Sequence, residues 1–228
     1  MAHALRYLTA AIAMATAVHG QPPRAPEQAF RFTVFSARPV EGVSFSPNLR
    51  AAPQKLVFYP TARSPRYEFR GALPLRFTDA SGAVVAEATV PPEMHDVLLL
   101  FSAVEPVPSS GLRYQIAVLD DGAARHGPSG LAIINLSGLA LAGTVGRADV
   151  VLKSGLNPTL QVSRTAKIML RTTFKGRSYQ SYAGELEMKA AERALLILFP
   201  PFYKGSLEVQ SRLLIDEPPL PPVPANAR

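Results

Sequence analysis

The sequence predicts an all-β protein, because short segments rich in β-branched and aromatic residues alternate with turns that contain Gly or Pro. Two continuous apolar segments, Val97–Phe101 and Ala194–Phe199, are typical of central strands that are buried on both faces. The segments around them alternate between apolar and polar residues, as expected of strands with one face in water. Only Glu185–Arg193 (ELEMKAAER) has the composition of a helix, and it is short.

The strands expected in the first half are Phe30–Ser36, Lys55–Tyr59, Leu73–Phe77, Val84–Val90, Asp96–Phe101 and Leu112–Leu119. Those expected in the second half are Leu131–Leu136, Ala148–Leu152, Thr159–Ser163, Ala166–Phe174, Tyr179–Met188, Ala194–Phe199 and Ser206–Ile215. We expect turns at Asp79–Gly82 and Lys175–Arg177, because glycine adopts the positive φ that tight turns require. Gly143–Gly146 is expected to be a break between strands.

The two halves of the chain repeat one pattern. In each half an apolar strand (DVLLLF, RALLILF), a Pro-containing turn and an alternating strand lead to an acidic residue. The sequence separation between matching residues is larger for Ser36 and Ser137 than for Asp120 and Asp216. A separation that decreases slowly along the chain is expected of two related domains when the second has shorter loops. We therefore predict two tandem immunoglobulin-like β-sandwiches, at residues 29–123 and 128–216. One larger sandwich of about 14 strands is the alternative.

Both ends of the chain are expected to lie outside the core. Residues 1–20 combine a weakly basic start, an apolar stretch and cleavage patterns after Ala17 or Gly20, as in a secretory signal peptide. The apolar stretch is shorter than the ~20 residues needed to span a bilayer. Residues 21–28 and the Pro-rich tail 217–228 are expected to be disordered. We therefore expect an exported, periplasmic or extracellular protein without a transmembrane span after cleavage.

The composition excludes several kinds of site. The chain has no cysteine, so it has no disulfide, zinc–thiolate site, iron–sulfur cluster or Cys nucleophile. After the predicted signal peptide, the only histidines are His95 and His126. They lie in separate segments, so we expect no metal site. No phosphate-binding glycine loop, nucleophile elbow or nucleic-acid recognition motif is present. We expect no catalytic residue, no cofactor and no nucleic-acid partner.

Glu93, His95 and Asp96 place two carboxylates beside an imidazole, the residue types of an acid–base or metal site. They follow Pro91-Pro92 and precede an apolar strand, so a polar turn is the favoured interpretation.

Two acidic pairs, Asp120-Asp121 and Asp216-Glu217, end corresponding strands. Adjacent residues of an extended chain point apart, so strand termination is favoured over a paired-carboxylate catalyst. Asn135-Leu136-Ser137 has the form of a glycosylation acceptor, but it lies inside an apolar strand, which indicates a chance match.

Basic residues are concentrated in the second half. The full chain has a net charge of +7, and Val150–Gly184 contains no acidic residue. Strand alternation predicts one basic side and one core side for this region. The basic side carries Lys167, Arg171, Lys175 and Arg177, and the core side Ile168, Leu170, Thr172 and Phe174. A solvated strand face that prevents edge-to-edge aggregation is the favoured interpretation of the basic side; the alternative is a surface that binds an anionic polymer of the cell envelope.

Leu131–Ser137 and the glycine-containing segment Gly143–Gly155 resemble a pattern of uncharacterised exported bacterial β-sandwich proteins. The resemblance implies a β-sandwich fold and no particular activity. In its length, export signal, basic charge and two sandwiches, the chain is also similar to the periplasmic chaperones of pilus assembly, by fold-level analogy.

We therefore expect a non-catalytic cell-envelope or periplasmic protein that binds or scaffolds, with a polyanion or a protein at a sheet edge as its partner. One alternative is a chaperone-like protein that pairs an exposed edge with a partner strand. A second alternative is an extracytoplasmic hydrolase that uses Glu93, His95 and Asp96 or another dispersed set of residues.

Overall fold

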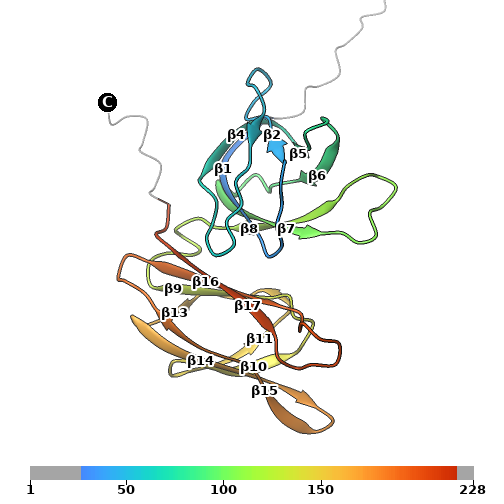
Figure 1. Ribbon diagram of the computed structural model, residues 1–228. Helices are drawn as coiled ribbons and strands as arrows, with labels where there is room; N and C mark the ends of the chain where they lie inside the picture. Colours follow the sequence, from blue (N-terminus) through green and yellow to red (C-terminus); the bar gives the residue numbers. More distant parts are fainter. Residues whose placement is uncertain (1–26, 220–228) are drawn as a thin grey trace, which may run out of the picture.

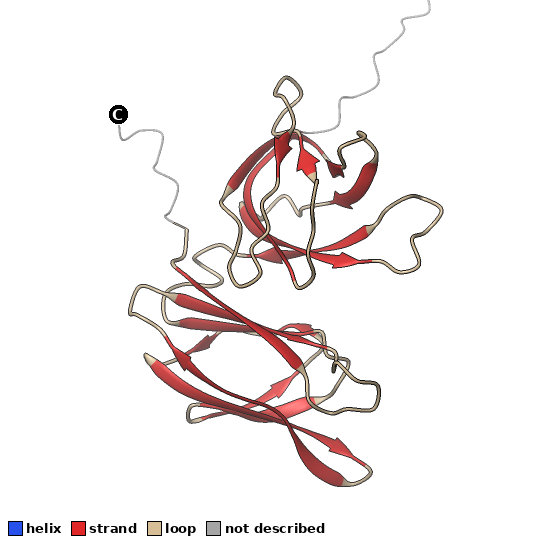
Figure 2. Cartoon of the chain, viewed as in Figure 1, coloured by secondary structure: helices blue, strands red, loops and turns tan. Residues whose placement is uncertain are grey.

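The computed structural model describes residues 27–219, and every regular element in this range is a strand, so the all-β prediction is confirmed (Figure 2). The predicted signal peptide, residues 21–26 of the predicted disordered segment 21–28, and residues 220–228 of the predicted tail lie outside the described residues. The strands are β1 (Glu27–Ser36), β2 (Ser44–Phe45), β3 (Gln54–Lys55), β4 (Tyr67–Ala72), β5 (Leu75–Thr78), β6 (Val84–Ala88), β7 (Asp96–Ala103), β8 (Tyr114–Asp120), β9 (Gly130–Asn135), β10 (Leu141–Val145), β11 (Ala148–Leu152), β12 (Gly155–Leu156), β13 (Leu160–Gln161), β14 (Thr165–Phe174), β15 (Arg177–Glu187), β16 (Arg193–Phe199) and β17 (Gln210–Asp216).

The first eight strands form two sheets that enclose one core. Sheet A has the order β4-β1-β7-β8, and sheet B has the order β3-β2-β5-β6. Sheet A buries alternate residues of β1, such as Phe32 and Val34, against residues of sheet B such as Phe45 and Phe77. Aromatic rings dominate this core, and the Phe32 and Phe45 rings meet edge to face at 4.9 Å, a favoured geometry for such pairs.

Strands β9 to β17 form a second pair of sheets around an aliphatic core. Sheet C has the order β12-β9-β16-β17, with β13 also paired to β9, and sheet D has the order β11-β10-β14-β15. Leu131 and Leu196 of sheet C pack with Ile168 and Leu170 of sheet D. We call β1–β8 the first unit and β9–β17 the second unit. Two separate cores contradict the alternative of one larger sandwich.

The two units stack through the outer faces of sheets A and C, so the sheets lie in the order B, A, C, D (Figure 1). Strand β7 buries Leu99 in the first core, whereas the next residue, Leu100, belongs to a third cluster between the units. Strand β16 likewise alternates between Leu196 in the second core and Ile197 in the third cluster. This alternation explains the continuous apolar sequence of both strands, because each has one face on its own core and the other on the neighbouring unit.

The two units share one strand order. In each, the first strand pairs in parallel with the second-last strand (β1 with β7, β9 with β16), which pairs antiparallel with the last. Sheets B and D likewise have matching orders. This is the pattern that a repeat predicts; descent from one ancestral unit and an immunoglobulin-like classification stay predictions.

The structure corrects two expectations about secondary structure at the strand ends. The helical candidate at Glu185–Arg193 is wrong, and the strand expected at Tyr179–Met188 is present instead: Glu185–Glu187 ends β15, a turn follows, and Arg193 begins β16. Leu186 and Met188 are buried in the second core while Glu187 between them is exposed, which is the two-residue period of a strand. At the other end of the described chain, Glu27 and Gln28 were expected in a disordered leader but pair with β4 as the start of β1.

Four strands were not expected from the sequence: β2, β4, β10 and β12. The expected break at Gly143–Gly146 is wrong over its first three residues, because Gly143–Val145 belong to β10, where Gly143 pairs with Leu170 of β14. A Cβ atom on Gly143 would clash with the backbone carbonyl of Met169. Glycine in a strand often marks such a close backbone approach, so here it forms part of the sheet rather than ending it.

No helix within residues 27–219 is long and apolar enough to cross a membrane.

Candidate functional site

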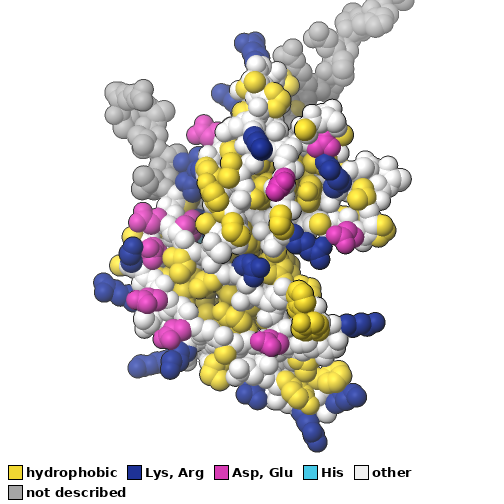
Figure 3. Space-filling view, in the orientation of Figure 1, with side chains coloured by type: hydrophobic (Ala, Val, Ile, Leu, Met, Phe, Trp, Pro, Cys, Tyr) yellow, Lys and Arg dark blue, Asp and Glu magenta, His cyan; other side chains and the backbone are white. Residues whose placement is uncertain are grey.

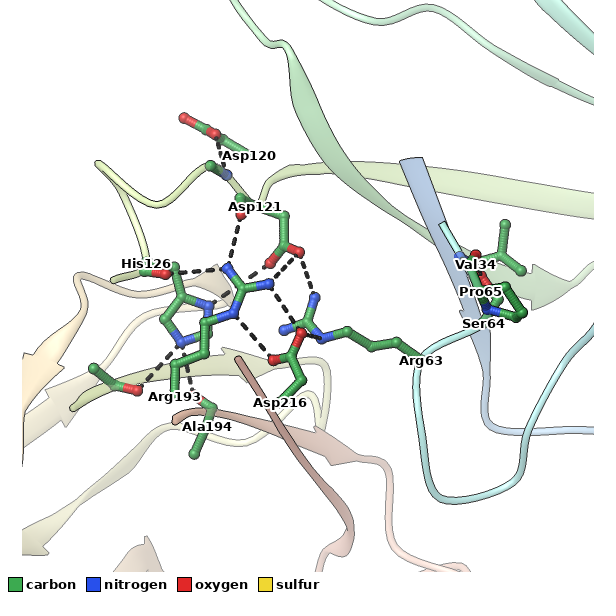
Figure 4. Close-up of polar contacts among 12 residues, drawn as sticks. Val34, Arg63, Ser64, Pro65, Asp120, Asp121, His126, Arg193, Ala194 and Asp216 are labelled. Carbon is green, nitrogen blue, oxygen red and sulfur yellow. Dashed lines mark hydrogen bonds and ion pairs between the residues drawn. The ribbon is translucent and has the colours of Figure 1, made fainter. Parts of the chain in front are cut away.

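The densest group of charged side chains lies buried where the two units meet (Figure 4). We call it the junction cluster. Arg63 comes from the loop between β3 and β4 of the first unit, and Asp121 directly follows β8. Arg193 and Asp216, from the start of β16 and the end of β17, belong to the second unit and are cross-strand partners. His126 completes the cluster from the connection between the units.

Arg193 is the centre of the junction cluster, and its side chain is fully buried. Its Nε donates to Asp216 Oδ1 at 3.0 Å, and Nη2 donates to Asp216 Oδ2 at 3.1 Å and to Asp121 Oδ2 at 2.8 Å. Its Nη1 donates to the backbone oxygens of Asp121 at 2.8 Å and His126 at 3.0 Å. A guanidinium has five N–H donors, and here each one has an acceptor. Burial lowers the pKa of Arg193, but the Asp121 and Asp216 carboxylates outweigh it and raise the pKa overall.

Asp121 links the two units through one oxygen. Its Oδ2 accepts from Arg63 Nη1 at 2.6 Å and from Arg193 Nη2 at 2.8 Å. Burial alone would raise the pKa of Asp121, but the positive charge of Arg63, the nearby His126 imidazole and the charge of Arg193 together lower it to about 2. Arg63 also places Nε at 3.3 Å from Asp216 Oδ2, so both carboxylates contact both arginines.

His126 holds the connection between the units as a packed corner. Its Nε2 lies 2.9 Å from the backbone oxygen of Ala194 and 3.3 Å from that of Gly130. Carbonyl oxygens only accept, so Nε2 carries a hydrogen. Its Nδ1 faces Asp121 Oδ1 at 3.7 Å.

The junction cluster can join the units but has no room for a substrate. The adjoining cavity, lined by Leu98, Asp121 and Leu195 among others, has a volume of about 10 Å³. That is space for no more than about one water molecule. The donors of Arg193 are all occupied within the protein, so this group has none left for a ligand.

The acidic pairs end their strands as expected, since β8 ends at Asp120 and β17 at Asp216. Sequence reasoning missed, however, that Asp121 and Asp216 converge on the same two arginines. The available signal was Arg193, a charged residue that opens a fully apolar strand. Such a residue needs a partner when it is buried.

The structure does not show Glu93, His95 and Asp96 acting on one another. Asp96 Oδ2 accepts from Arg31 Nη2 at 2.7 Å, and Glu93 and His95 are exposed. His95 lines an open pocket of about 640 Å³ together with Arg31, Glu68 and Arg70, among others. Within residues 27–219, no three His, Cys, Asp or Glu side chains are grouped so that they could hold a metal ion.

The expected basic side of β14 is divided by the structure. Lys167 and Arg171 are exposed on the outer face of sheet D, as expected, but Lys167 lies opposite Glu185 of β15. Lys175 sits in the turn with a positive φ of 49°, and the chain reverses there. Arg177 therefore lies opposite Phe174, on the other face from Arg171.

Arg171, Lys175 and Arg177 surround the tip of one hairpin. Pairing of β14 with β10 ends at Arg171, whereas pairing with β15 continues to Phe174. The last residues are thus a two-stranded extension beyond the sandwich, visible at the lower right of Figure 1. Phe174 was expected to face the core, but on this extension half of its surface is exposed. The Lys175 ammonium lies 5.4 Å from the centre of its ring, within range of a cation–π interaction.

The glycosylation-like segment at Asn135 is buried. The Asn135 side chain is 2% exposed, donates to the backbone oxygen of Leu139 at 3.0 Å and accepts from Ser137 Oγ at 2.6 Å. In the folded protein this amide serves a turn and is closed to modification.

No protein-family model matches this chain, and no curated protein sequence is similar to it. Its function must therefore be argued from its own geometry.

Proposed function

We propose that this protein is an exported, non-catalytic binding module that contacts an anionic envelope polymer through the end of its second unit. The observation that carries the proposal is the charge of two neighbouring segments, residues 171–183 and 199–212. Together they contain five Lys or Arg residues and one acidic residue, Glu208. A concentration of one charge attracts polymers of the opposite charge over distances of about a Debye length, ~8 Å at physiological salt.

The two segments lie side by side. The backbone N–H of Val209, in the loop that joins β16 to β17, donates to the backbone oxygen of Ser181 in β15 at 3.0 Å. The basic residues of both segments therefore belong to one end of the molecule. We call it the basic end, with Arg171, Lys175 and Arg177 on the hairpin and Lys204 in the loop.

The charges on the outer face of sheet D favour the basic end, rather than that face, as the contact surface. Glu185 and Glu187 of β15 lie opposite Lys167 and Thr165, and Asp149 of β11 is also exposed. These carboxylates offset the positive charge along the strand, whereas the hairpin tip has no acidic residue. These charges support a contact surface at Arg171, Lys175 and Arg177 rather than along the whole of β14.

Retention on an immobilised acidic polysaccharide over a salt series tests the proposal. A variant with Arg171→Glu, Lys175→Glu and Arg177→Glu should elute at lower salt than the wild type. A variant with Arg50→Glu, Lys55→Glu and Arg66→Glu changes the net charge equally at exposed residues of the first unit. Equal elution of the two variants would reduce the effect to net charge and contradict the proposal.

Strand pairing along β8 is the second candidate. This edge strand of sheet A (YQIAVLD) contains no Lys, Arg or Pro, the residues that usually block edge-to-edge pairing. A partner that adds a strand would slow hydrogen exchange of β8 amides in the complex. Unchanged exchange along β8 in the presence of a bound partner would eliminate this mode.

A further inference from the structure

The basic end also carries the three most exposed aromatic side chains of the described residues, Phe202, Tyr203 and Phe174. Phe202 and Tyr203, in the β16–β17 loop, are 74% and 73% exposed, and their rings pack edge to face with centroids 4.9 Å apart. Phe174 and Tyr179, on the hairpin extension, are 50% and 39% exposed. Leaving large apolar rings in water is unfavourable, so a cluster of them indicates a surface that is covered in use.

Phe202 and Tyr203 project from a loop, and Phe174 and Tyr179 from the strands of the hairpin, with basic residues beside them. Pro200-Pro201 precedes Phe202 and restricts the backbone, and Lys204 follows Tyr203. On the hairpin, Phe174 is followed by Lys175 and lies opposite Arg177. Figure 3 shows hydrophobic and basic side chains alternating over this end of the second unit, at the lower right.

We propose that the basic end docks on an anionic lipid bilayer, with Phe202 and Tyr203 inserted at the level of the headgroups. This inference rests on the proposed function, because the same lysines and arginines would bind the anionic groups. The inference differs from the proposed function because it names lipid headgroups, rather than a soluble polymer, as the source of those anionic groups.

The chemistry of the exposed residues favours a bilayer over a polysaccharide. A phenylalanine side chain has no hydrogen-bonding group for a sugar, but it gains free energy when it leaves water for the boundary of the acyl chains. Tyrosine is suited to the same depth, since its hydroxyl stays at the polar side. Lys and Arg beside the rings then neutralise headgroup charge at the membrane surface. Cations alone would suffice for a soluble polyanion.

Sedimentation with vesicles is the first test. The probe is vesicles of phosphatidylglycerol and phosphatidylcholine in equal parts, with pure phosphatidylcholine vesicles as the uncharged arm. The protein should begin at Gln21, because the apolar stretch before it would itself bind lipid. We expect sedimentation with the anionic vesicles only, and binding at least about tenfold weaker in the Arg171→Glu, Lys175→Glu, Arg177→Glu variant.

The aromatic contribution is tested by Phe202→Ser with Tyr203→Ser, which should weaken binding to anionic vesicles at least about tenfold and leave polysaccharide retention unchanged. The matched control is Leu49→Ser with Val107→Ser, two exposed apolar residues of the first unit, 88% and 53% exposed. The control should bind vesicles as the wild type does.

A fluorescence measurement reports insertion directly. The chain has no tryptophan, so Phe202→Trp introduces a single indole at the loop. Its emission should shift to shorter wavelength with anionic vesicles and be quenched by brominated acyl chains, whereas Leu49→Trp should show neither effect.

Each outcome separates the two proposals. Retention on polysaccharide without vesicle binding would overturn the lipid inference and leave the proposed function standing. Vesicle binding that is unchanged by Phe202→Ser with Tyr203→Ser, or an unshifted Phe202→Trp emission, would overturn insertion in the same way. Binding to neither probe would reject both.

Discussion

Asp121→Asn should destabilise the protein strongly, because it removes one charge from a buried group and leaves its shape in place. In the folded protein Arg63 and Arg193 would then share the single carboxylate of Asp216. Removal of one partner from a buried ion pair costs about 3–5 kcal/mol, since the remaining charge stays buried without compensation. For a chain of this length, such a loss lowers the melting temperature by about 6–20 °C.

The acid dependence of stability gives a second measure of the same group. The pKa of Asp121 falls from 3.8 to about 2 on folding, which corresponds to about 2.5 kcal/mol of stability. Because the folded pKa is the lower one, this contribution is present above about pH 4. It is lost as the pH falls from about 4 towards 2. Urea unfolding followed by circular dichroism over this range should show the loss in the wild type.

The variant should lack that acid-dependent component, since asparagine does not titrate. The matched control is Asp149→Asn, an exposed residue of β11, for which the change in unfolding free energy should stay within about 0.5 kcal/mol. A loss below about 1 kcal/mol in Asp121→Asn, with the acid dependence of the wild type retained, would refute the assignment of the junction cluster as the main polar link between the units.

Two further changes test the packing. Ile197→Ala opens a cavity between sheets A and C at a fully buried residue and should lower the free energy of unfolding by about 2–5 kcal/mol. Calorimetry should show this loss as a lower melting temperature. An unchanged melting temperature would mean that the two faces are not in contact. Gly143→Ala places a methyl group against the Met169 carbonyl and should prevent correct pairing of β10 with β14. Gly111→Ala, with a φ of 78° and open space around it, should cost only about 1 kcal/mol of backbone strain, so equal melting temperatures for the two glycine variants would contradict the close approach.

The strands that the sequence predicted are those with a local signal. The apolar runs of β7 and β16 were identified, and so was burial on both faces, because uninterrupted apolar sequence requires it. No local signal in the sequence shows what covers the second face of these two strands. Each unit covers that face of the other, and this depends on how sheets A and C stack.

The junction cluster lay beyond prediction for a similar reason. Arg63, Asp121, Arg193 and Asp216 come from four separate segments, and only the stacking of the units brings them together. The alternation rule also failed at the hairpin tip. It assigned Phe174 to the core, but β14 extends past its pairing with β10, so there is no second sheet for the ring to meet.

Because sheets A and C stack, the two units of this chain pack like the two subunits of a dimer, but a covalent connection joins them. A unit cut off after β8 would present Phe35, Leu98 and Leu100 to water, and would be driven to pair with another copy or to aggregate. Pairing between free subunits weakens on dilution, as mass action requires. The covalent connection through Gly122–Gly130 fixes the effective concentration of each half for the other. The interface between the two units should thus stay intact at any dilution of the protein.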